Sequence, residues 1–388
     1  MASGQNMMIQ FLKKFDKYPF LLKLEGKEYV IGTGKPRFTI NLKKTLPITD
    51  LLTSTSLCLG EAYMRGDLDV EGDLYEALDY FLGQMDEFST DQSALRKLIF
   101  TCGSKKSQME EIAHHYDKGN EFYELWLDET MSYSCACFQS EGDSLADAQR
   151  YKTERILDKL CIKEGMRLLD IGCGWGYLLI AAAKKYKTKS LGITLSKEQQ
   201  KACRERVAKE GLQEYITVEL MDYRDLPKYG KFFDRVVSIG MLEHVGRVNY
   251  GVFVECVDKV LEQGGLFLLQ FISSLTEHPG DPWMKKYIFP GGAIPSLREI
   301  EWALSARNFY TLDVESLRRH YNKTLLCWIR NFRESEEQIK EMFGEEFARM
   351  WDLYLCACAA TFHNGIIDVH QILASKGVNN QLPLTRWY

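Results

Sequence analysis

The stretch that decides the fold is residues 166–176, MRLLDIGCGWG. An apolar run closes on Asp170, and Gly172, Gly174 and Gly176 follow at alternate positions before a helical pattern begins. Glycines allow a sharp turn and a close approach of backbone to ligand, and the first turn of a helix presents unpaired N–H groups. The pattern predicts a nucleoside site at the carboxyl end of a parallel strand, with a glycine-rich structural turn as the alternative. Neither the G-x-G-x-x-G spacing nor a phosphate-binding loop ending in Lys-Ser/Thr fits it well.

The surrounding sequence alternates between apolar strands and helical segments, which is typical of an α/β fold with a mostly parallel sheet. We predict strands at 167–171, 189–193, 216–219, 234–239 and 265–271, and helices at 178–186 and 197–209. The tail, 334–374, is predicted to form two helices interrupted at Gly344 and Gly365.

The amino end is predicted to form a small mixed α/β domain over residues 1–95, with short strands at 25–31 and 37–42. A polar linker, 96–110, leads to the larger α/β domain, 111–388. Residues 1–49 carry nine Lys/Arg against three acidic residues, whereas residues 50–90 carry one Arg against ten. The basic block contains apolar residues at helical spacing with lysines largely on the other side: Met8, Phe11, Leu12 and Phe15 against Lys13, Lys14 and Lys17. This helix is expected either to pack on its own domain or to lie on an anionic bilayer.

Composition limits the class of protein. With 388 residues, 45% hydrophobic and 27% charged, the protein is expected to be globular with about two domains. A net charge of −5 offers no general basic field for nucleic acid. We find no apolar run long enough to span a bilayer and no secretory signal, and the eleven dispersed cysteines suggest a reducing cytoplasm. We expect no metal, because Cys135 and Cys137 are too close for a metal knuckle and His114 and His115 lack acidic residues at ligand spacing.

Polar residues follow the next two predicted strands. The second strand lacks the acidic residue that often holds ribose hydroxyls, so Thr194, Ser196 and Gln199 are the polar candidates there. Ser196 and Gln199 also satisfy a helix-capping pattern, and both roles can hold at once. After the third strand, Asp222, Tyr223 and Arg224 stand where an adenine is usually held, with a surface turn as the alternative.

The strand-D-x-G-x-G-x-G-helix pattern resembles motif I of the class I methyltransferases, whose cofactor is S-adenosylmethionine. Further segments occur in the order and spacing of bacterial cyclopropane-fatty-acyl-phospholipid synthases: HHYDKGNEFYELWLDETMSYSCACF, LLDIGCGWG, GITLSKEQ, IGMLEHVG, DPWMKKYIFPGGAIPS and HYNKTLLCW. The sequence resembles that family over about residues 111–375, and more weakly over LGEAYMRGDLDVEGDL in the amino-terminal domain. It is also similar to the mycolic acid cyclopropane synthases, which lack the extra amino-terminal domain.

The resemblance implies a class I, Rossmann-like S-adenosylmethionine-dependent methyltransferase fold. The implied reaction transfers a methylene unit to the cis double bond of a phospholipid acyl chain through a carbocation. It also implies a bound bicarbonate ion as general base, cradled by Cys135, Glu243, Tyr321 and the backbone of Ile272, with Glu243 relaying the proton. The cofactor contacts it implies, together with the polar candidates above, are Tyr116, Tyr133, Ser134, Asp170, Gly172, Cys173, Gly174, Gly176, Thr194, Leu195, Gln199, Asp222, Tyr223 and Arg224. Structural roles are the alternatives for Glu243, as a turn-capping carboxylate, and for Tyr321, as a buried phenol.

Two residues need separate treatment. Many relatives carry His where this sequence has Gln270, and glutamine forms hydrogen bonds but does not titrate near neutral pH. We therefore predict that Gln270 positions bicarbonate while Glu243 alone relays the proton. Cys358 matches a cysteine sometimes considered catalytic in the family, but its neighbours are apolar and helical, which favours packing.

The resemblance further implies peripheral contact with the cytoplasmic face of a phospholipid membrane and a homodimer. Aromatic residues are candidates either for an acyl channel or for the core: Trp283, Tyr287, Phe289, Trp328 and Phe362. Two other functions remain open, namely methylation of an acyl carbon without ring closure, and lipid binding by an inactive catalytic domain.

Overall fold

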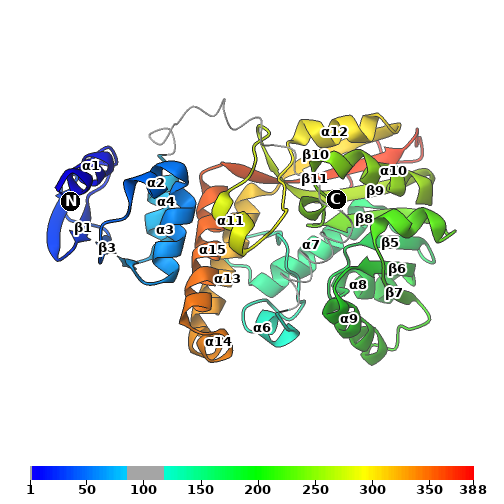
Figure 1. Ribbon diagram of the computed structural model, residues 1–388. Helices are drawn as coiled ribbons and strands as arrows, with labels where there is room; N and C mark the ends of the chain where they lie inside the picture. Colours follow the sequence, from blue (N-terminus) through cyan, green and yellow to red (C-terminus); the bar gives the residue numbers. More distant parts are fainter. Residues whose placement is uncertain (1, 85–117) are drawn as a thin grey trace. The chain divides into compact units, whose positions relative to one another are not determined.

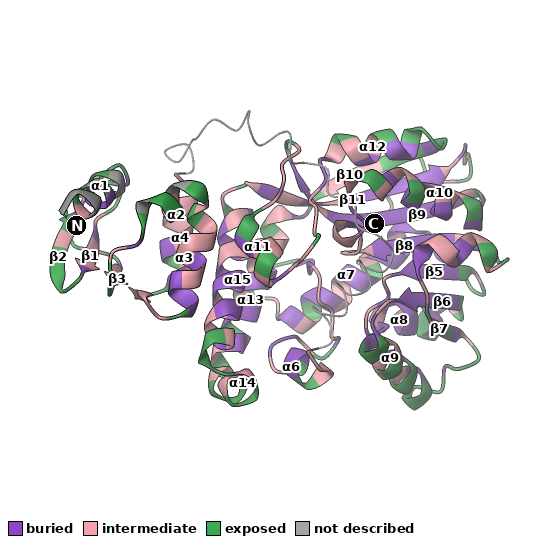
Figure 2. Cartoon of the chain, viewed as in Figure 1, coloured by how far each residue is buried: buried purple, intermediate pink, exposed green. Residues whose placement is uncertain are grey.

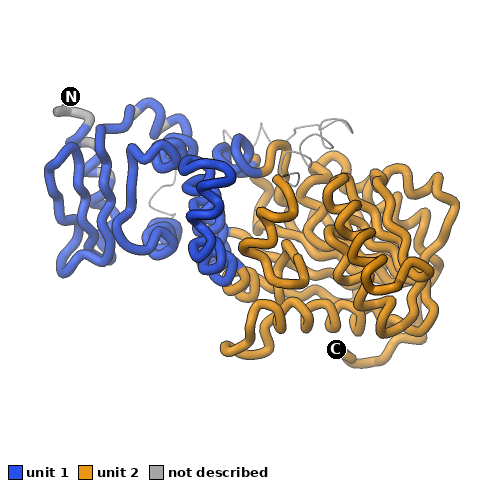
Figure 3. The backbone as a smooth tube through the Cα atoms, turned by 90° about the horizontal axis from the view of Figure 1, so that it is seen from below, with its two compact units in different colours: residues 1–96, 280–288, 325–366 blue, residues 97–279, 289–324, 367–388 orange. Residues whose placement is uncertain are grey.

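The computed structural model describes residues 2–84 and 118–388, except for the side chains of residues 2–4, 7, 11, 48 and 52. The protein forms two compact units (Figure 3). Unit 1 contains Met1–Arg96, Gly280–Ile288 and Leu325–Ile366, and unit 2 contains Lys97–Pro279, Phe289–Thr324 and Ile367–Tyr388. The predicted linker, 96–110, lies wholly outside the described residues, and the division at about residue 95 into separate domains stays a prediction.

Unit 2 is built on a seven-stranded sheet with the order β10-β11-β9-β8-β5-β6-β7 (Figure 1). Five strands run parallel: β5 (Arg167–Ile171), β6 (Lys189–Thr194), β7 (Ile216–Leu220), β8 (Phe233–Ile239) and β9 (Leu261–Ser274). β10 (Phe309–Ser316) and β11 (Ile367–Lys376) are antiparallel additions beside β9. All five predicted strands are confirmed, and β5 has the predicted bounds.

The prediction for the tail is partly wrong. Helices α14 (Glu336–Phe343) and α15 (Glu345–His363) flank Gly344, but β11 follows Gly365 in place of further helix. β11 lies between β10 and β9 and pairs with β9 from Ile367↔Ser274 to Ser375↔Leu266. These backbone hydrogen bonds to a distant segment decide the conformation of β11, and local periodicity cannot reveal them.

Helices cover both faces of this sheet, and its strands are mostly buried (Figure 2). Successive residues of a strand point to opposite faces, so they pack against different helices. Leu168 and Leu268 pack with α7 (Leu145–Lys159), α8 (Tyr177–Tyr186) and α9 (Lys197–Lys209). Leu169 and Phe267 belong to the opposite cluster, with α10 (Tyr250–Val260) and α12 (Leu297–Ser305). A site on this sheet therefore opens at the strand ends.

Unit 1 combines a four-stranded sheet with helices. The sheet has the order β2-β1-β3-β4, with β1 (Phe20–Leu24), β2 (Lys27–Ile31), β3 (Thr39–Leu42) and β4 (Leu68–Glu71). The two short strands predicted here correspond to β2 and β3. Its helices are α1 (Ala2–Leu12), α2 (Ile48–Thr53), α3 (Thr55–Met64), α4 (Leu74–Leu82), α11 (Pro282–Tyr287), α14, α15 and the later part of α13 (Arg318–Glu334).

The amino-terminal helix packs within unit 1. Met8 and Ile9 are each 8% exposed, Phe15 after the helix is fully buried, and all three belong to the core of this unit. The packing interpretation therefore holds for these residues, while Lys13 and Lys17 are exposed. Among the described residues, no helix is long and apolar enough to cross a membrane.

Most of the aromatic candidates are core residues. Trp283, Trp328 and Phe362 are 3%, 0% and 1% exposed. Trp283 lies so close to α3 that a Cβ on Gly60 would come within 2.4 Å of its ring. The hydroxyl of Tyr287 donates to Glu61 at 2.9 Å. These side chains belong to α11, α13 and α15 and pack within unit 1, which favours a role in the core over a role in lining an acyl channel.

We expect Phe267→Ala to lower the free energy of unfolding by about 3–5 kcal/mol, because it removes a fully buried ring from the middle of β9. Phe232→Ala is the matched control, since that ring is 50% exposed, and it should change the value by less than about 0.5 kcal/mol. Urea denaturation followed by circular dichroism measures both. Equal losses would contradict the assignment of Phe267 to the core.

Candidate active site

The turn after β5 needs glycine for a different reason at each position. Gly172, Gly174 and Gly176 have φ of 90°, 53° and 80°, where L side chains are strained. A Cβ on Gly172 would lie 3.0 Å from Met241, and one on Gly176 would lie 2.2 Å from Sγ of Cys203. A Cβ on Gly174 would meet nothing within 4 Å. The turn thus opens toward space at Gly174 and leads into α8 at Gly176.

A pocket lies at this turn, at the carboxyl ends of β5, β6 and β8. Most of the predicted cofactor contacts line it: Tyr133, Ser134, Asp170, Gly172, Cys173, Gly174, Gly176, Thr194, Leu195, Gln199 and Tyr223. Asp222 and Arg224 do not line it, and Tyr116 lies outside the described residues.

At the end of β6 the structure shows both predicted roles: Ser196 caps a helix, and Gln199 lines the pocket. The hydroxyl of Ser196 accepts a hydrogen bond from the backbone N–H of Gln199 at 3.2 Å and caps α9. Thr194 donates its hydroxyl to Oε1 of Gln199 at 2.9 Å. Because Thr194 and Gln199 also line the pocket, their side chains are held in place beside it.

At the end of β7 the polar residues are paired with one another. The guanidinium of Arg224 donates to both carboxylate oxygens of Asp222 at 2.7 Å, and Asp222 caps the short helix that begins at Tyr223. Tyr223 lines the pocket, and no hydrogen-bond partner of its buried hydroxyl is found among the described residues. The direct contact of Asp222 with the cofactor stays a prediction.

The sequence analysis missed two residues of α7 that support the pocket. Lys152, which is 4% exposed, lines the pocket and donates to Oγ of Ser134 at 3.0 Å. Gln149, which is fully buried, donates to the backbone oxygens of Ser132 and Ser134 at 3.2 and 2.9 Å. Gln149 and Lys152 fall at helical spacing among buried residues, and two polar residues on a buried face were the signal that could have identified them.

Lys152 and Asp170 form the charged part of the pocket. Burial raises the pKa of Asp170 to about 7, and the charge of Lys152 partly opposes that rise. Burial lowers the pKa of Lys152, and the neighbouring groups Cys137, Cys135, Asp128 and Asp170 partly oppose this decrease. His244 also lines the pocket, and burial lowers its pKa to about 4, so its ring is neutral at pH 7. The pocket therefore contains one buried acidic and one buried basic side chain, and burial disfavours the charged form of both.

Glu243 lies just beyond this pocket, in the short helix Leu242–His244 after β8. Its Oε1 accepts a hydrogen bond from the backbone N–H of Ile272 on β9 at 2.5 Å. Its Oε2 is buried without a hydrogen-bond partner among the described residues. Burial raises the pKa of this carboxyl to about 7, which the hydrogen bond from Ile272 moderates. The backbone of Ile272 was predicted to face an anion, and its N–H is instead used by Glu243.

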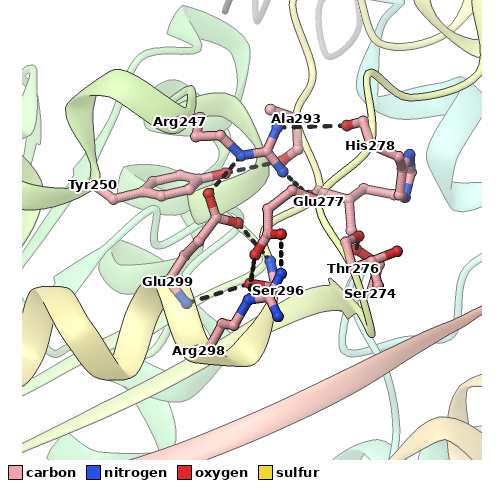
Figure 4. A network of polar contacts seen from close by, with 11 residues as sticks. Arg247, Tyr250, Ser274, Thr276, Glu277, His278, Ala293, Ser296, Arg298 and Glu299 are labelled. Carbon is pink, nitrogen blue, oxygen red and sulfur yellow. Dashed lines mark hydrogen bonds and ion pairs between the residues drawn. The ribbon is translucent and has the colours of Figure 1, made fainter. Parts of the chain in front are cut away.

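Polar contacts fix the backbone around Glu243, and Figure 4 shows the neighbouring network that includes Arg247, Ser296 and Glu299. The carbonyl of Glu243 accepts from the N–H of Ala293 at 3.0 Å, and Arg247 donates to the carbonyl of Ile294 at 3.0 Å and to Glu299 at 2.6 Å. Glu299 also closes a capping box with Ser296 at the start of α12. The turn that carries Glu243 is thus tied to the segment that returns to unit 2.

The remaining predicted residues lie in separate places. Cys135 is fully buried, its thiol donates to the backbone oxygen of Leu317 at 3.7 Å, and burial raises its pKa well above the ordinary value. The N–H of Tyr321 donates to that same oxygen of Leu317 at 3.0 Å, so Cys135 lies at the start of the helix that carries Tyr321. Gln270 is 2% exposed on β9. Cys358 belongs to α15 in unit 1, where burial raises its pKa to about 12, which keeps the thiol neutral and favours packing.

A mostly parallel sheet flanked by helices, with a glycine turn and pocket at the ends of its central strands, defines a class I S-adenosylmethionine-dependent methyltransferase. A family model described as mycolic acid cyclopropane synthetase matches residues 103–372, and a second, described only as a domain of unknown function, matches residues 7–93. The protein belongs to the mycolic acid cyclopropane synthetase family.

Individual proteins agree with this assignment. The sequence is 39% identical over 347 residues to the cyclopropane-fatty-acyl-phospholipid synthase of Escherichia coli K12, covering 87% of each protein. It is 38% identical over 380 residues to a probable fatty acid methyltransferase of Pseudomonas putida, covering 95% of each. The solved mycolic acid cyclopropane synthase CmaA1 complexed with SAH and CTAB is similar with a TM-score of 0.66 and 33% identity, covering 71% of this protein and 99% of that one.

We expect Gly176→Ala to destabilise the protein more than Gly174→Ala. Both substitutions place a side chain at positive φ, which costs about 1–2 kcal/mol, but only the first also forces a Cβ against Cys203. Urea denaturation without cofactor measures the difference, and Cys203→Ala should recover part of the loss in the Gly176→Ala background. Equal losses for the two variants, with no recovery, would contradict this packing.

Proposed function

We propose that the protein transfers a methylene unit from S-adenosylmethionine to the cis double bond of an unsaturated phospholipid acyl chain and closes a cyclopropane ring. The observation that carries this proposal is the Glu243 carboxyl beside the cofactor pocket, with a pKa of about 7 and a buried Oε2 that has no hydrogen-bond partner in the part of the protein that the structure describes. Ring closure needs a proton acceptor near the transferred carbon, and a carboxyl with this pKa can take up and release a proton near neutral pH. Family membership supports the substrate class.

The reaction balances as follows. The alkene electrons form a bond to the methyl carbon while the carbon–sulfur bond breaks, which leaves a cation on the neighbouring acyl carbon. A proton then leaves the new methyl group, and the electrons of that C–H bond close the ring. S-adenosylmethionine supplies the electrophilic methyl group when bound. The protein's own part is to align the reactants, exclude water and receive the proton.

We propose that an ion held beside Glu243 is bicarbonate, which when bound supplies the base for this proton. The O–H group of bicarbonate is a donor of the kind that Oε2 of Glu243 lacks among the described residues. Cys135 is a neutral thiol that would turn its S–H from Leu317 to the ion, and Gln270 and Tyr321 complete the proposed cradle. The backbone of Ile272 takes part through Glu243, which its N–H holds in place. Glu243 accepts the proton from this group and passes it outward.

A second candidate is methylation of the acyl chain without ring closure, which the name of the Pseudomonas putida relative favours. An inactive lipid-binding protein is less well supported, since the glycine turn, the pocket and Glu243 are all present.

We further propose that the protein acts as a homodimer at the cytoplasmic surface of a membrane, with residues 1–95 as the lipid-associated domain. The reaction as proposed uses no metal, so chelators should leave its rate unchanged.

Product analysis tests the proposed reaction. Purified protein, S-adenosylmethionine and vesicles of unsaturated phospholipid should yield acyl chains heavier by one CH2 group that elute with a cyclopropane standard and resist hydrogenation. Glu243→Gln should lower the rate at least about 100-fold while SAH still binds, and the exposed Glu214→Gln should match the wild type. A product that takes up hydrogen would establish the second candidate instead, and no transfer at all would sink both enzymatic proposals.

Vesicle cosedimentation tests the proposed membrane surface. Lys13→Glu/Lys14→Glu should weaken binding to anionic vesicles at least about tenfold, and added salt should weaken wild-type binding, because each lysine near an anionic surface contributes about 1 kcal/mol. Lys163→Glu/Lys209→Glu changes the net charge equally at exposed sites in unit 2 and should leave binding unchanged. Equal effects of the two pairs would place the membrane surface elsewhere.

A further inference from the structure

Three buried polar side chains form a hydrogen-bonded line through unit 2. Gln270 on β9, Gln371 on β11 and Lys159 at the end of α7 are 2%, 3% and 1% exposed. Gln371 donates its amide nitrogen to Oε1 of Gln270 at 2.7 Å, and Lys159 donates to Oε1 of Gln371 at 2.8 Å. The two glutamines stand directly opposite each other in the β9–β11 pairing.

This line has a direction, and Lys159 sets it. An ammonium group only donates hydrogen bonds, so the amide oxygen of Gln371 must face Lys159. The amide nitrogen of Gln371 then faces Gln270, which must present its oxygen in return. The NH2 group of Gln270 is therefore turned away from Gln371. Reversing either amide would place two donors or two acceptors against each other.

The charged end of the line is held firmly. Glu315 accepts from Lys159 at 2.5 Å and from Arg155 at 2.8 Å. Burial raises the pKa of Glu315, but the hydrogen bonds from Lys159 and Arg155 outweigh burial and leave it below the ordinary value. The ring of Tyr388 lies over Lys159, 4.8 Å from Nζ to the ring centroid. Lys159 is thus a fixed donor.

The other end of the line lies at the proposed reaction centre. Gln270 precedes Ile272, whose N–H holds Glu243, by two residues on β9, and its carbonyl accepts from the N–H of Gly240 at 2.9 Å. Gly240 begins the turn that carries Glu243. No hydrogen bond from the amide nitrogen of Gln270 is found among the described residues.

We propose that Lys159 and Gln371 are positioning residues that lock the amide of Gln270 with its N–H donor toward the anion held beside Glu243. Burying the ammonium group of Lys159 costs desolvation free energy that an apolar side chain would avoid. A role in orienting the amide donor of Gln270 would explain why a charged residue occupies this position. The inference rests on the proposed function, and specifically on the use of bicarbonate. Gln270 would then act only as a donor and could not act as an acceptor toward that anion.

The variant Gln371→Glu tests the direction of the line. A carboxylate at 371 still accepts from Lys159 but cannot donate to Gln270, so the amide of Gln270 must reverse and present its oxygen to the anion. We expect the apparent KM for bicarbonate to rise about tenfold or more, since a hydrogen bond to a charged group contributes about 1.5–3 kcal/mol. The kcat at saturating bicarbonate should change little, and SAH affinity by calorimetry should stay within about twofold.

A second substitution provides the rescue. Gln270→His in the Gln371→Glu background can donate one ring N–H to residue 371 and the other to the anion when the imidazole is protonated. Bicarbonate affinity should recover at low pH and decline as the ring loses its proton, a decline that adds to the pH dependence that Glu243 gives the wild type. Gln263→Glu, at an exposed position of β9, is the matched control and should match the wild type.

The outcomes separate this inference from the proposed function. A wild-type rate independent of bicarbonate in depleted buffer would overturn this inference and the use of bicarbonate, whereas only the absence of a cyclopropane product would overturn the proposed reaction. A wild-type rate that depends on bicarbonate, with the same apparent KM in Gln371→Glu, would overturn only the positioning role of Lys159 and Gln371. Equal losses of bicarbonate and SAH affinity would also overturn it, because they would indicate a structural defect.

Discussion

The site depends on one contact, in which the backbone N–H of Ile272 holds a single carboxyl oxygen of the buried Glu243. Burying a carboxylate is unfavourable unless hydrogen bonds compensate, and here only half of the group is compensated within the described residues. The pKa of this carboxyl is accordingly raised to about 7. Such an arrangement persists only where the surrounding backbone is fixed, which the contacts of Arg247 and Ala293 achieve.

The parallel sheet explains why the cofactor pocket and Glu243, the proposed proton acceptor, lie beside each other. The carboxyl ends of β5, β6 and β8 meet at one edge, so the glycine turn and the turn after β8 face the same space. Gly240, Met241 and His244 line the pocket, while Glu243 within the same turn bonds to β9. One short helical turn therefore sets the distance from the pocket to Glu243. A small shift of that turn would separate the two, and this accounts for the network that ties it to α12.

Much of the fold followed from the sequence, because the strands of the parallel sheet are short apolar runs with local signals. β5 and the glycine turn were predicted with their bounds, whereas β11 was mistaken for helix since its partner β9 lies about a hundred residues away. In the site, residue types were predictable from motifs but contacts were not. The N–H of Ile272 bonds to Glu243, Arg224 pairs with Asp222, and Lys152 reaches the pocket from a helix without a recognisable motif. Each depends on which distant segments pack together.

Titration of Glu243 itself tests the central claim most directly. Carbon-13 NMR of the protein labelled at the carboxyl carbons of its glutamate residues, compared with Glu243→Gln, isolates the signal of this one group. The account predicts that it titrates near pH 7, where burial and a single hydrogen bond place the pKa. A signal that titrates near the ordinary value of about 4.5 would contradict it, because the carboxyl would then be hydrated or fully paired and could not act as the proposed proton acceptor near neutral pH.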